Sequence, residues 1–141
     1  MKPAARHKAR KFALQALYQI LFSKADTASV SAQHLAFMKE NKVDEIYFRE
    51  LVFGVENEID VLDEILRPHL DRSIDTLTPI ELCVLRMATF ELKHRLDIPY
   101  RVVLNEALEL TKTFGTQEGF KFVNGVLDKT ARQLRQGECT K

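Results

Sequence analysis

The feature that most constrains this chain is the helical spacing of its apolar residues, which recurs along almost the whole sequence. Valine, isoleucine and threonine never alternate over a long stretch, as they would in β-strands. The one Asn-Gly pair, a dipeptide typical of tight hairpins, lies inside a helical pattern at residues 124–125. The spacing therefore predicts an all-α fold with about seven helices, over residues 5–22, 31–41, 44–56, 57–69, 79–94, 99–114 and 117–135.

Capping signals support several of these boundaries. Asp44 is placed to cap the third helix, and residues 78–81 read Thr-Pro-Ile-Glu, the pattern of a capping box with proline at the first helical position. Asp97 and Pro99 repeat this arrangement before the sixth helix. Gly115 is expected to end that helix in the left-handed conformation.

A length of 141 residues and a hydrophobic content of 45% favour a single domain with a sizeable core. The composition changes near residues 71–78, which fits either two small bundles that share one interface or one continuous bundle. We expect one helical domain over residues 1–135 and a flexible tail over residues 136–141.

The fifth helix is apolar nearly all round and is expected at the centre of the fold. Arg86, Thr89 and Lys93 form a thin stripe on it that is expected to be wet. Glu91 lies outside that stripe and is expected to accept a hydrogen bond inside the fold or at a partner surface. The carboxylates of the middle helices are expected to form a solvated face; they are Glu56, Glu58, Asp60, Asp63 and Glu64.

Several classes of protein are excluded by absent patterns. No apolar run reaches 18 residues, so no membrane contact is predicted, and the basic start lacks the apolar stretch of a signal peptide. Cys83, Cys139 and the four scattered histidines do not have metal-ligand spacing, which predicts a cytoplasmic protein without a structural metal. We find no nucleophile–base pattern, phosphate loop or dinucleotide fingerprint. The sequence predicts a binding module, with no catalytic residues, no cofactor and no enzymatic activity.

Charge is unevenly distributed along a chain whose net charge is only +1. Residues 1–25 contain six basic and no acidic residues, residues 26–110 have a net charge of −8, and residues 111–141 have a net charge of +3. Two basic ends that lie near each other would form one patch suited to a polyanion. The plain alternative is a pair of solvated helix ends.

The first helix concentrates this charge at its start. Arg6 and Arg10 continue the line of Leu17 and Leu21 on a helical wheel, where a buried helix would carry apolar residues. Because isolated charges are costly to bury, the first turns are expected either to project past the core or to fray, and in both cases to display both arginines. Arginine side chains suit phosphates and base edges.

The last helix carries an aromatic side chain off its apolar face. Phe122 lies toward Glu118, Gly125 and Lys129 on an ideal wheel, with Lys121 beside it. An aromatic ring among lysines is suited to stacking on the bases of single-stranded RNA. Packing of Phe122 against a neighbouring helix is an equally good interpretation of the sequence.

Five segments resemble the NusB family of bacterial transcription antitermination factors, in order and with matching spacing: KPAARHKAR…ALQALYQ, YFRELVFGV, LTPIELCVLRMATFEL, DIPYRVVLNEALELTKTFG and KFVNGVLDK. The resemblance covers about residues 2–132. It implies two perpendicular helical bundles and a heterodimer with ribosomal protein NusE that binds single-stranded boxA RNA, chiefly of ribosomal RNA transcripts. It also implies indirect contact with RNA polymerase and other Nus factors, which helps the polymerase to continue past terminators.

The resemblance also implies the binding residues. Those expected at the RNA are Lys2, Arg6, His7, Arg10, Tyr18, Glu118, Lys121 and Phe122, and those expected at NusE are Tyr18 and Glu81. Many relatives carry arginine at the position of His7, so one charge there depends on pH. The stretch 116–120 varies in the family, and no match extends past Gln133.

Three other functions fit parts of the pattern. Related domains form the N-terminal part of ribosomal RNA cytosine methyltransferases, although no cofactor domain follows here. A helical DNA-binding regulator would need a recognition helix with several outward polar residues. The third is a protein adaptor in which the basic start is incidental.

Overall fold

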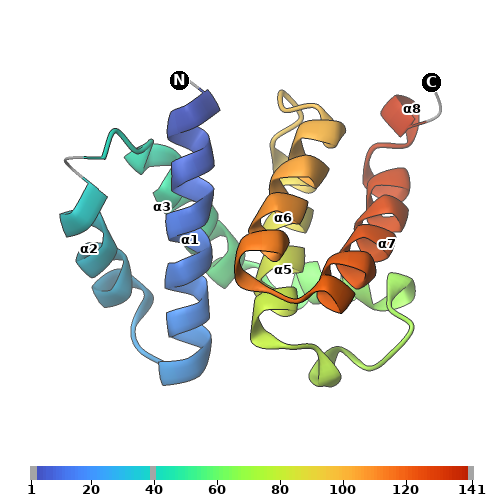
Figure 1. Cartoon of the computed structure of the whole chain (residues 1–141), viewed down its shortest axis with the longest axis horizontal. Coiled ribbons are helices and arrows are strands. Elements are labelled where there is room, and N and C mark those ends of the chain that lie inside the picture. Colours follow the sequence, from blue (N-terminus) through green and yellow to red (C-terminus); the bar gives the residue numbers. More distant parts are fainter. Residues whose placement is uncertain (1–2, 39–40, 140–141) are drawn as a thin grey trace. The chain divides into compact units, whose positions relative to one another are not determined.

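The computed structural model describes residues 3–38 and 41–139. Within these ranges every regular element is a helix, α1 to α8 with two 3-10 helices, η1 and η2, between α4 and α5 (Figure 1). The all-α prediction is confirmed. The largest boundary difference is at α2 (Thr27–Met38), which starts before residue 31 because the Asp26 carboxylate accepts a hydrogen bond from Ser29 N–H at 3.1 Å. Residues 39–40, at the predicted end of that helix, lie outside the described ranges.

The chain divides into two compact units, residues 1–57 (unit 1) and residues 58–141 (unit 2). Their number agrees with the two small bundles that the sequence and the family resemblance suggest. The perpendicular arrangement of the bundles and the treatment of residues 1–135 as one domain stay predictions.

Unit 1 is a bundle of α1 (Pro3–Ser23), α2 and α3 (Glu45–Asn57), in which α1 packs along α3 and beside α2 (Figure 1). The predicted cap of α3 is confirmed, since Asp44 Oδ1 accepts a hydrogen bond from Tyr47 N–H at 3.0 Å. Apolar residues of α1 and α3 form the core between these helices: Ala9, Ala13, Leu14, Ala16, Leu17 and Ile20 of α1, and Phe48, Leu51, Val52 and Val55 of α3.

Unit 2 is built around α5 (Pro79–His94), which packs against α4 (Ile59–Leu66), α6 (Tyr100–Phe114) and α7 (Gln117–Leu134). The prediction of a central, buried fifth helix is confirmed. The capping box at its start is also present: Glu81 N–H donates to Thr78 Oγ1 at 3.2 Å, and Thr78 N–H donates to Glu81 Oε1 at 3.1 Å. The helices η1 (Arg67–His69) and η2 (Ile74–Thr76) lie in the connection from α4 to α5.

The polar stripe of α5 is not wet, contrary to expectation. Arg86 makes two 2.9 Å hydrogen bonds to the buried carboxylate of Asp63, and Lys93 donates to Glu58 at 2.8 Å. Thr89 is fully buried. Two carboxylates expected on a solvated face therefore pair with α5, because α4 brings them against its cations. Glu91 is buried, in agreement with a place inside the fold.

Two predictions about how α6 begins and ends are wrong. Asp97 does not cap α6; its carboxylate pairs with Arg95 at 3.0 Å. Gly115 is extended, with φ −109° and ψ −157°, and not left-handed. Glycine is needed there for space, because an added Cβ would lie 2.9 Å from the carbonyl oxygen of Thr111.

Residues 136–139, part of the predicted tail, form the short helix α8 (Gln136–Cys139). Glu138 Oε2 accepts a hydrogen bond from Tyr100 N–H at 2.9 Å and so satisfies the start of α6. The buried Arg135 guanidinium donates to the carbonyl oxygens of Glu91, Leu92, Arg95 and Ile98. Residues 135–138 thus hold the end of α5 and the start of α6 together.

Candidate nucleic-acid interface

The arginines of α1 are held by α3 rather than displayed. The Arg6 guanidinium lies 5.1 Å from the Tyr47 ring centroid and its Nε lies 3.9 Å from Asp44 Oδ2. Arg10 lies 5.4 Å from the same ring and is only 3% exposed. The expectation that the first turns project past the core is therefore wrong for Arg10. An aromatic face and a carboxylate supplied by α3 make these cations less costly to bury.

Other polar side chains of α1 face solvent. His7, Lys8 and Lys11 are exposed, and Lys8 Nζ donates to the carbonyl oxygen of Asn41 at 2.9 Å. Lys2, predicted to bind RNA, lies outside the described residues.

Tyr18 belongs to a different part of α1 from Arg6. Twelve residues separate the two, which corresponds to about 18 Å along a helix. Tyr18 is 37% exposed, and its ring centroid lies 4.9 Å from that of Phe22, which is 64% exposed. The described part of α1 therefore presents a basic start and, further along, an exposed apolar patch formed by Tyr18, Leu21 and Phe22.

The start of α7 displays the residues that the last-helix pattern predicts. Thr116 caps the helix by accepting a hydrogen bond from Gly119 N–H at 2.9 Å. Glu118 and Lys121 are exposed, and Phe122 is half-buried. The ring of Phe122 is covered by the Arg72 guanidinium, whose central carbon lies 4.2 Å from the ring centroid. The ring thus packs within the protein, but against a surface arginine of the connection after α4 and not against a neighbouring helix, and its stacking on RNA bases stays a prediction.

A cavity of about 170 Å³ lies beside this pair. Its lining combines cations, one carboxylate and the Phe122 ring: His69, Asp71, Lys121, Phe122, Gly125, Val126 and Lys129. We call these residues together with Arg72 the α7 cradle. Sequence reasoning placed Lys121, Gly125 and Lys129 near Phe122 but missed His69, Asp71 and Arg72. Those three follow α4, and no helical period relates them to α7.

The charges of the α7 cradle are partly matched within it. Arg72 donates to Asp71 at 2.7 Å and 3.3 Å, and this hydrogen bonding holds the pKa of Asp71 below its ordinary value. Lys129 lowers the pKa of Asp71 further through its charge. Because Asp71 and Arg72 offset each other, Lys121 and Lys129 give the cradle a net positive charge.

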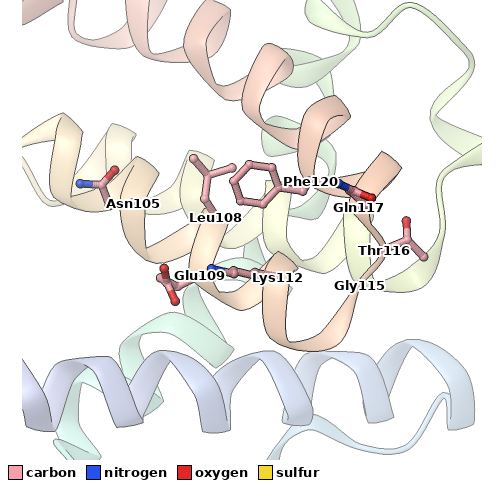
Figure 2. A pocket seen from close by; sticks show the side chains of 8 residues that line it. All are labelled: Asn105, Leu108, Glu109, Lys112, Gly115, Thr116, Gln117 and Phe120. Atoms are coloured by element: carbon pink, nitrogen blue, oxygen red, sulfur yellow. The ribbon is translucent and has the colours of Figure 1, made fainter.

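A larger pocket of about 650 Å³ lies between α6 and the start of α7 (Figure 2). Leu108 and the Phe120 ring face each other on its apolar side, and charged and amide groups stand around them in Figure 2. The lining residues are Asn105, Leu108, Glu109, Lys112, Gly115, Thr116, Gln117 and Phe120. The rim of this pocket includes Thr116, which caps α7. Lys121 lies within about two helical turns of Thr116, so a ligand bound at Lys121 would lie near the pocket.

Glu81, predicted at the NusE edge, has a structural role. Besides the capping box, its Oε2 lies 3.0 Å from the position that a Cβ on Gly119 would occupy. Glycine at 119 therefore lets the start of α7 lie against the start of α5. A contact of Glu81 with a partner stays a prediction.

Within residues 3–38 and 41–139, no group of three or more histidine, cysteine, aspartate or glutamate side chains is arranged to hold a metal ion. Over the same ranges, no helix is both long enough and apolar enough to cross a membrane. The chemistry that the described surface offers is recognition of an anion by lysine, arginine and aromatic side chains.

These features define a class: an all-helical protein with a cationic and aromatic candidate nucleic-acid interface. The NusB family model matches residues 7–132, which is most of the chain. The protein called transcription antitermination protein NusB in Alcanivorax borkumensis is 51% identical over 138 residues, covering 98% of this chain and 92% of the relative. That of Idiomarina loihiensis is 53% identical over 135 residues, covering 96% and 97%. The chain belongs to the NusB family of transcription antitermination proteins.

Solved structures agree in fold. Thermotoga maritima NusB superposes with a TM-score of 0.84 at 28% identity, over 96% of this chain and 97% of that one. A NusB chain solved with NusE and double-stranded RNA gives a TM-score of 0.80 at 25% identity, over 94% and 99%. The family resemblance that the sequence motifs indicate is confirmed.

Proposed function

We propose that this protein is a bacterial antitermination factor that binds single-stranded boxA RNA of nascent ribosomal RNA transcripts together with ribosomal protein NusE. Bound in this way, it supports elongation through terminators and contacts RNA polymerase and other Nus factors indirectly. The observation that carries the proposal is identity of about half over nearly the full length of relatives named as antitermination proteins. Such a factor works in the cytoplasm and acts by binding, without catalysis.

The RNA surface proposed here has two parts. In unit 2 it is the α7 cradle with Glu118 at its edge, where exposed Lys121 meets the Arg72–Phe122 pair. In unit 1 it is the basic start of α1, with Lys2, Arg6 and His7 at the RNA. Arg10 is assigned to holding α1 against Tyr47, because it is buried. An aromatic ring among cations favours single strands, whose bases are free to stack.

NusE is the proposed protein partner. A solved relative forms a complex with NusE and RNA. The acidic middle of this chain, with a net charge of −8 over residues 26–110, suits a basic ribosomal protein. Tyr18 and Glu81 are the proposed contacts, and the exposed ring of Phe22 extends the apolar area beside Tyr18.

The test is fluorescence anisotropy with labelled boxA RNA and a scrambled RNA of equal length, each titrated with the protein alone and with NusE. We expect preference for boxA, strengthened by NusE, and a log–log salt slope of about −0.7 per phosphate neutralised. Equal affinity for both RNAs, unchanged by NusE, would contradict the proposal.

Two rival functions can be tested with the same protein sample. Tighter binding to duplex DNA than to single-stranded RNA would favour a DNA-binding regulator. Methyl transfer from S-adenosylmethionine to ribosomal RNA would favour the methyltransferase relationship. Neither activity is expected, because relatives about half identical over nearly their full length are named as antitermination proteins.

A further inference from the structure

The stacking face of Phe122 is already occupied by a side chain of the protein itself. The Arg72 guanidinium carbon lies 4.2 Å from the ring centroid, a distance typical of a cation lying on an aromatic face. A nucleobase needs that same distance and that same face to stack on the ring. Direct stacking on this face of Phe122 therefore requires that Arg72 first move away.

Arg72 is held where it lies. Its Nε and one terminal nitrogen donate to the two carboxylate oxygens of Asp71, at 2.7 Å and 3.3 Å. This paired contact fixes the plane of the guanidinium as well as its position. Asp71 is held in its ionised form, because its hydrogen bond to Arg72 and the nearby charge of Lys129 lower its pKa.

One face of the guanidinium remains available. The side chain of Arg72 is 47% exposed although one of its faces rests on Phe122. Guanidinium groups are planar, weakly hydrated and stack on aromatic rings, and RNA bases are known to stack on them. A base that stacks on the exposed face of Arg72 would therefore extend the stack that Arg72 and Phe122 already form.

The surroundings of the pair have room and charge for a nucleotide. The cavity of about 170 Å³ opens beside Phe122, between Lys121 and Lys129. Gly125, one helical turn after Lys121, is exposed, and an added Cβ there would meet no atom within 4 Å. The absence of a side chain keeps the approach to the cavity open, and both lysines stand where a phosphate could reach them.

We propose that a base of single-stranded RNA stacks on the guanidinium of Arg72, with its phosphate toward Lys121 and Lys129. Phe122 and Asp71 are then positioning residues, which hold the guanidinium flat and facing outward. This inference rests on the proposed RNA-binding function and adds to it the group that meets the base. It assigns Arg72 a binding role that the resemblance of motifs does not supply.

The experiment uses the full chain and a single-stranded RNA that contains one 2-aminopurine, whose fluorescence is quenched when it stacks. Affinity, salt slope and quenching are measured for the wild-type protein, Arg72→Ala, Arg72→Lys and Phe122→Leu. The matched control is Arg132→Ala, an exposed arginine of α7 that pairs with Asp128. It lies about 15 Å further along the helix than Phe122. Circular dichroism verifies that each variant is folded.

We expect Arg72→Ala to weaken RNA binding about tenfold and to abolish the quenching, because a stacked base is lost. Arg72→Lys keeps the charge and hence the salt slope, yet loses the quenching, because an ammonium group offers no plane. Phe122→Leu reduces the quenching only in part, since the guanidinium remains but is held less firmly. Arg132→Ala is expected to match the wild type.

Three results would overturn the inference. If Arg72→Ala binds as tightly as the wild type and quenches as strongly, the base stacks on Phe122 itself, and only the present inference fails. If Arg72→Lys restores the quenching fully, the role of Arg72 is charge alone, and stacking on it is excluded. If the wild-type protein binds no RNA in the anisotropy titration, the proposed function fails and the inference with it.

Discussion

The starts of α1 and α7 look alike in sequence, because each combines cations with an aromatic residue nearby, but they differ in structure. At the start of α1 the arginines are drawn inward by Asp44 and Tyr47 of the same unit. In α7, Lys121 near the start and Lys129 two turns further along stay at the surface around a cavity, and Arg72, which contacts the Phe122 ring, is half exposed.

The difference shows what decides whether a basic residue is available to a ligand. A cation that is buried against an aromatic face of its own fold, as Arg10 is, contributes to stability first, whereas Arg72 keeps an exposed side chain although it has both a carboxylate and an aromatic partner. A cation without such partners contributes to the surface potential. Mutation of the buried Arg10 of α1 should therefore change stability, and mutation of the exposed Lys121 of α7 should change RNA affinity.

The largest expected effect is at Arg10. Arg10→Ala should lower the free energy of unfolding by about 2–3 kcal/mol, because it removes a buried cation and its contact with Tyr47. Arg10→Met is the matched control, since it keeps most of the packing volume and should cost less. Urea unfolding followed by circular dichroism measures both. Unchanged stability with a reduced RNA salt slope would show that Arg10 belongs to the RNA surface after all.

The next effect is at Asp44, which has two roles. Asp44→Ala should cost about 1–2 kcal/mol, because it removes the cap of α3 and the partner of Arg6. Asp44→Asn keeps a capping oxygen but not the charge, so the difference between the two variants measures the cap alone. Urea unfolding of both variants gives the comparison. Equal losses would mean that the charge contact with Arg6 matters more than the cap.

A smaller effect, and one on binding only, is expected at Lys121. Lys121→Ala should leave the unfolding curve unchanged, because the side chain is exposed. RNA affinity should fall about fourfold at 0.15 M salt, and the salt slope should decrease by about 0.7, as for one phosphate contact. Anisotropy titrations at several salt concentrations give both numbers. A loss of stability here would place Lys121 in the same class as Arg10.

The smallest effect concerns acid and separates the two units. Burial lowers the pKa of His34 below 6.5, so the unfolded chain takes up this proton first and unit 1 loses stability as the pH falls through 6.5. In unit 2, Lys93 and His94 lower the pKa of Glu58 against the opposing effect of burial, so the contribution of Glu58 to stability is lost only below about pH 4.5.

Amide hydrogen exchange at pH 7 and 5.5 measures this difference between the units. At pH 5.5, α1–α3 should open faster than they do at pH 7. His34→Gln should remove the difference, and a difference that persists would assign it to another group.

Much of the fold could be predicted from the sequence because local signals determine it. Helical periods, the capping box at residues 78–81 and the cap at Asp44 depend on neighbours in the chain, and they are confirmed. Two local signals fail, the cap at Asp97 and the left-handed Gly115, and the other errors lie where distant segments meet. Nothing in the pattern around Arg10 shows that Tyr47 lies under it, and nothing around Phe122 shows that Arg72 covers it.

The candidate site follows the same rule. The helical wheel of α7 was enough to place Lys121, Gly125 and Lys129 near Phe122, since all four share one helix. His69, Asp71 and Arg72 come from the connection after α4, whose irregular backbone carries no period. A single sequence could not place them beside α7.

The anchoring of α5 and α6 by Arg135 and Glu138 has a consequence for the order in which the chain folds during translation. Arg135 follows Arg95, one of its carbonyl partners, by 40 residues. At about 5–20 residues per second, the ribosome needs roughly 2–8 s to synthesise that interval. The contacts within unit 1 are complete once residue 57 has left the ribosome, whereas the end of α5 and the start of α6 wait for residues 135–138. The basic first helix is thus packed while the α7 cradle is still unfinished, so we expect a newly made chain to bind RNA only after its last helices have emerged.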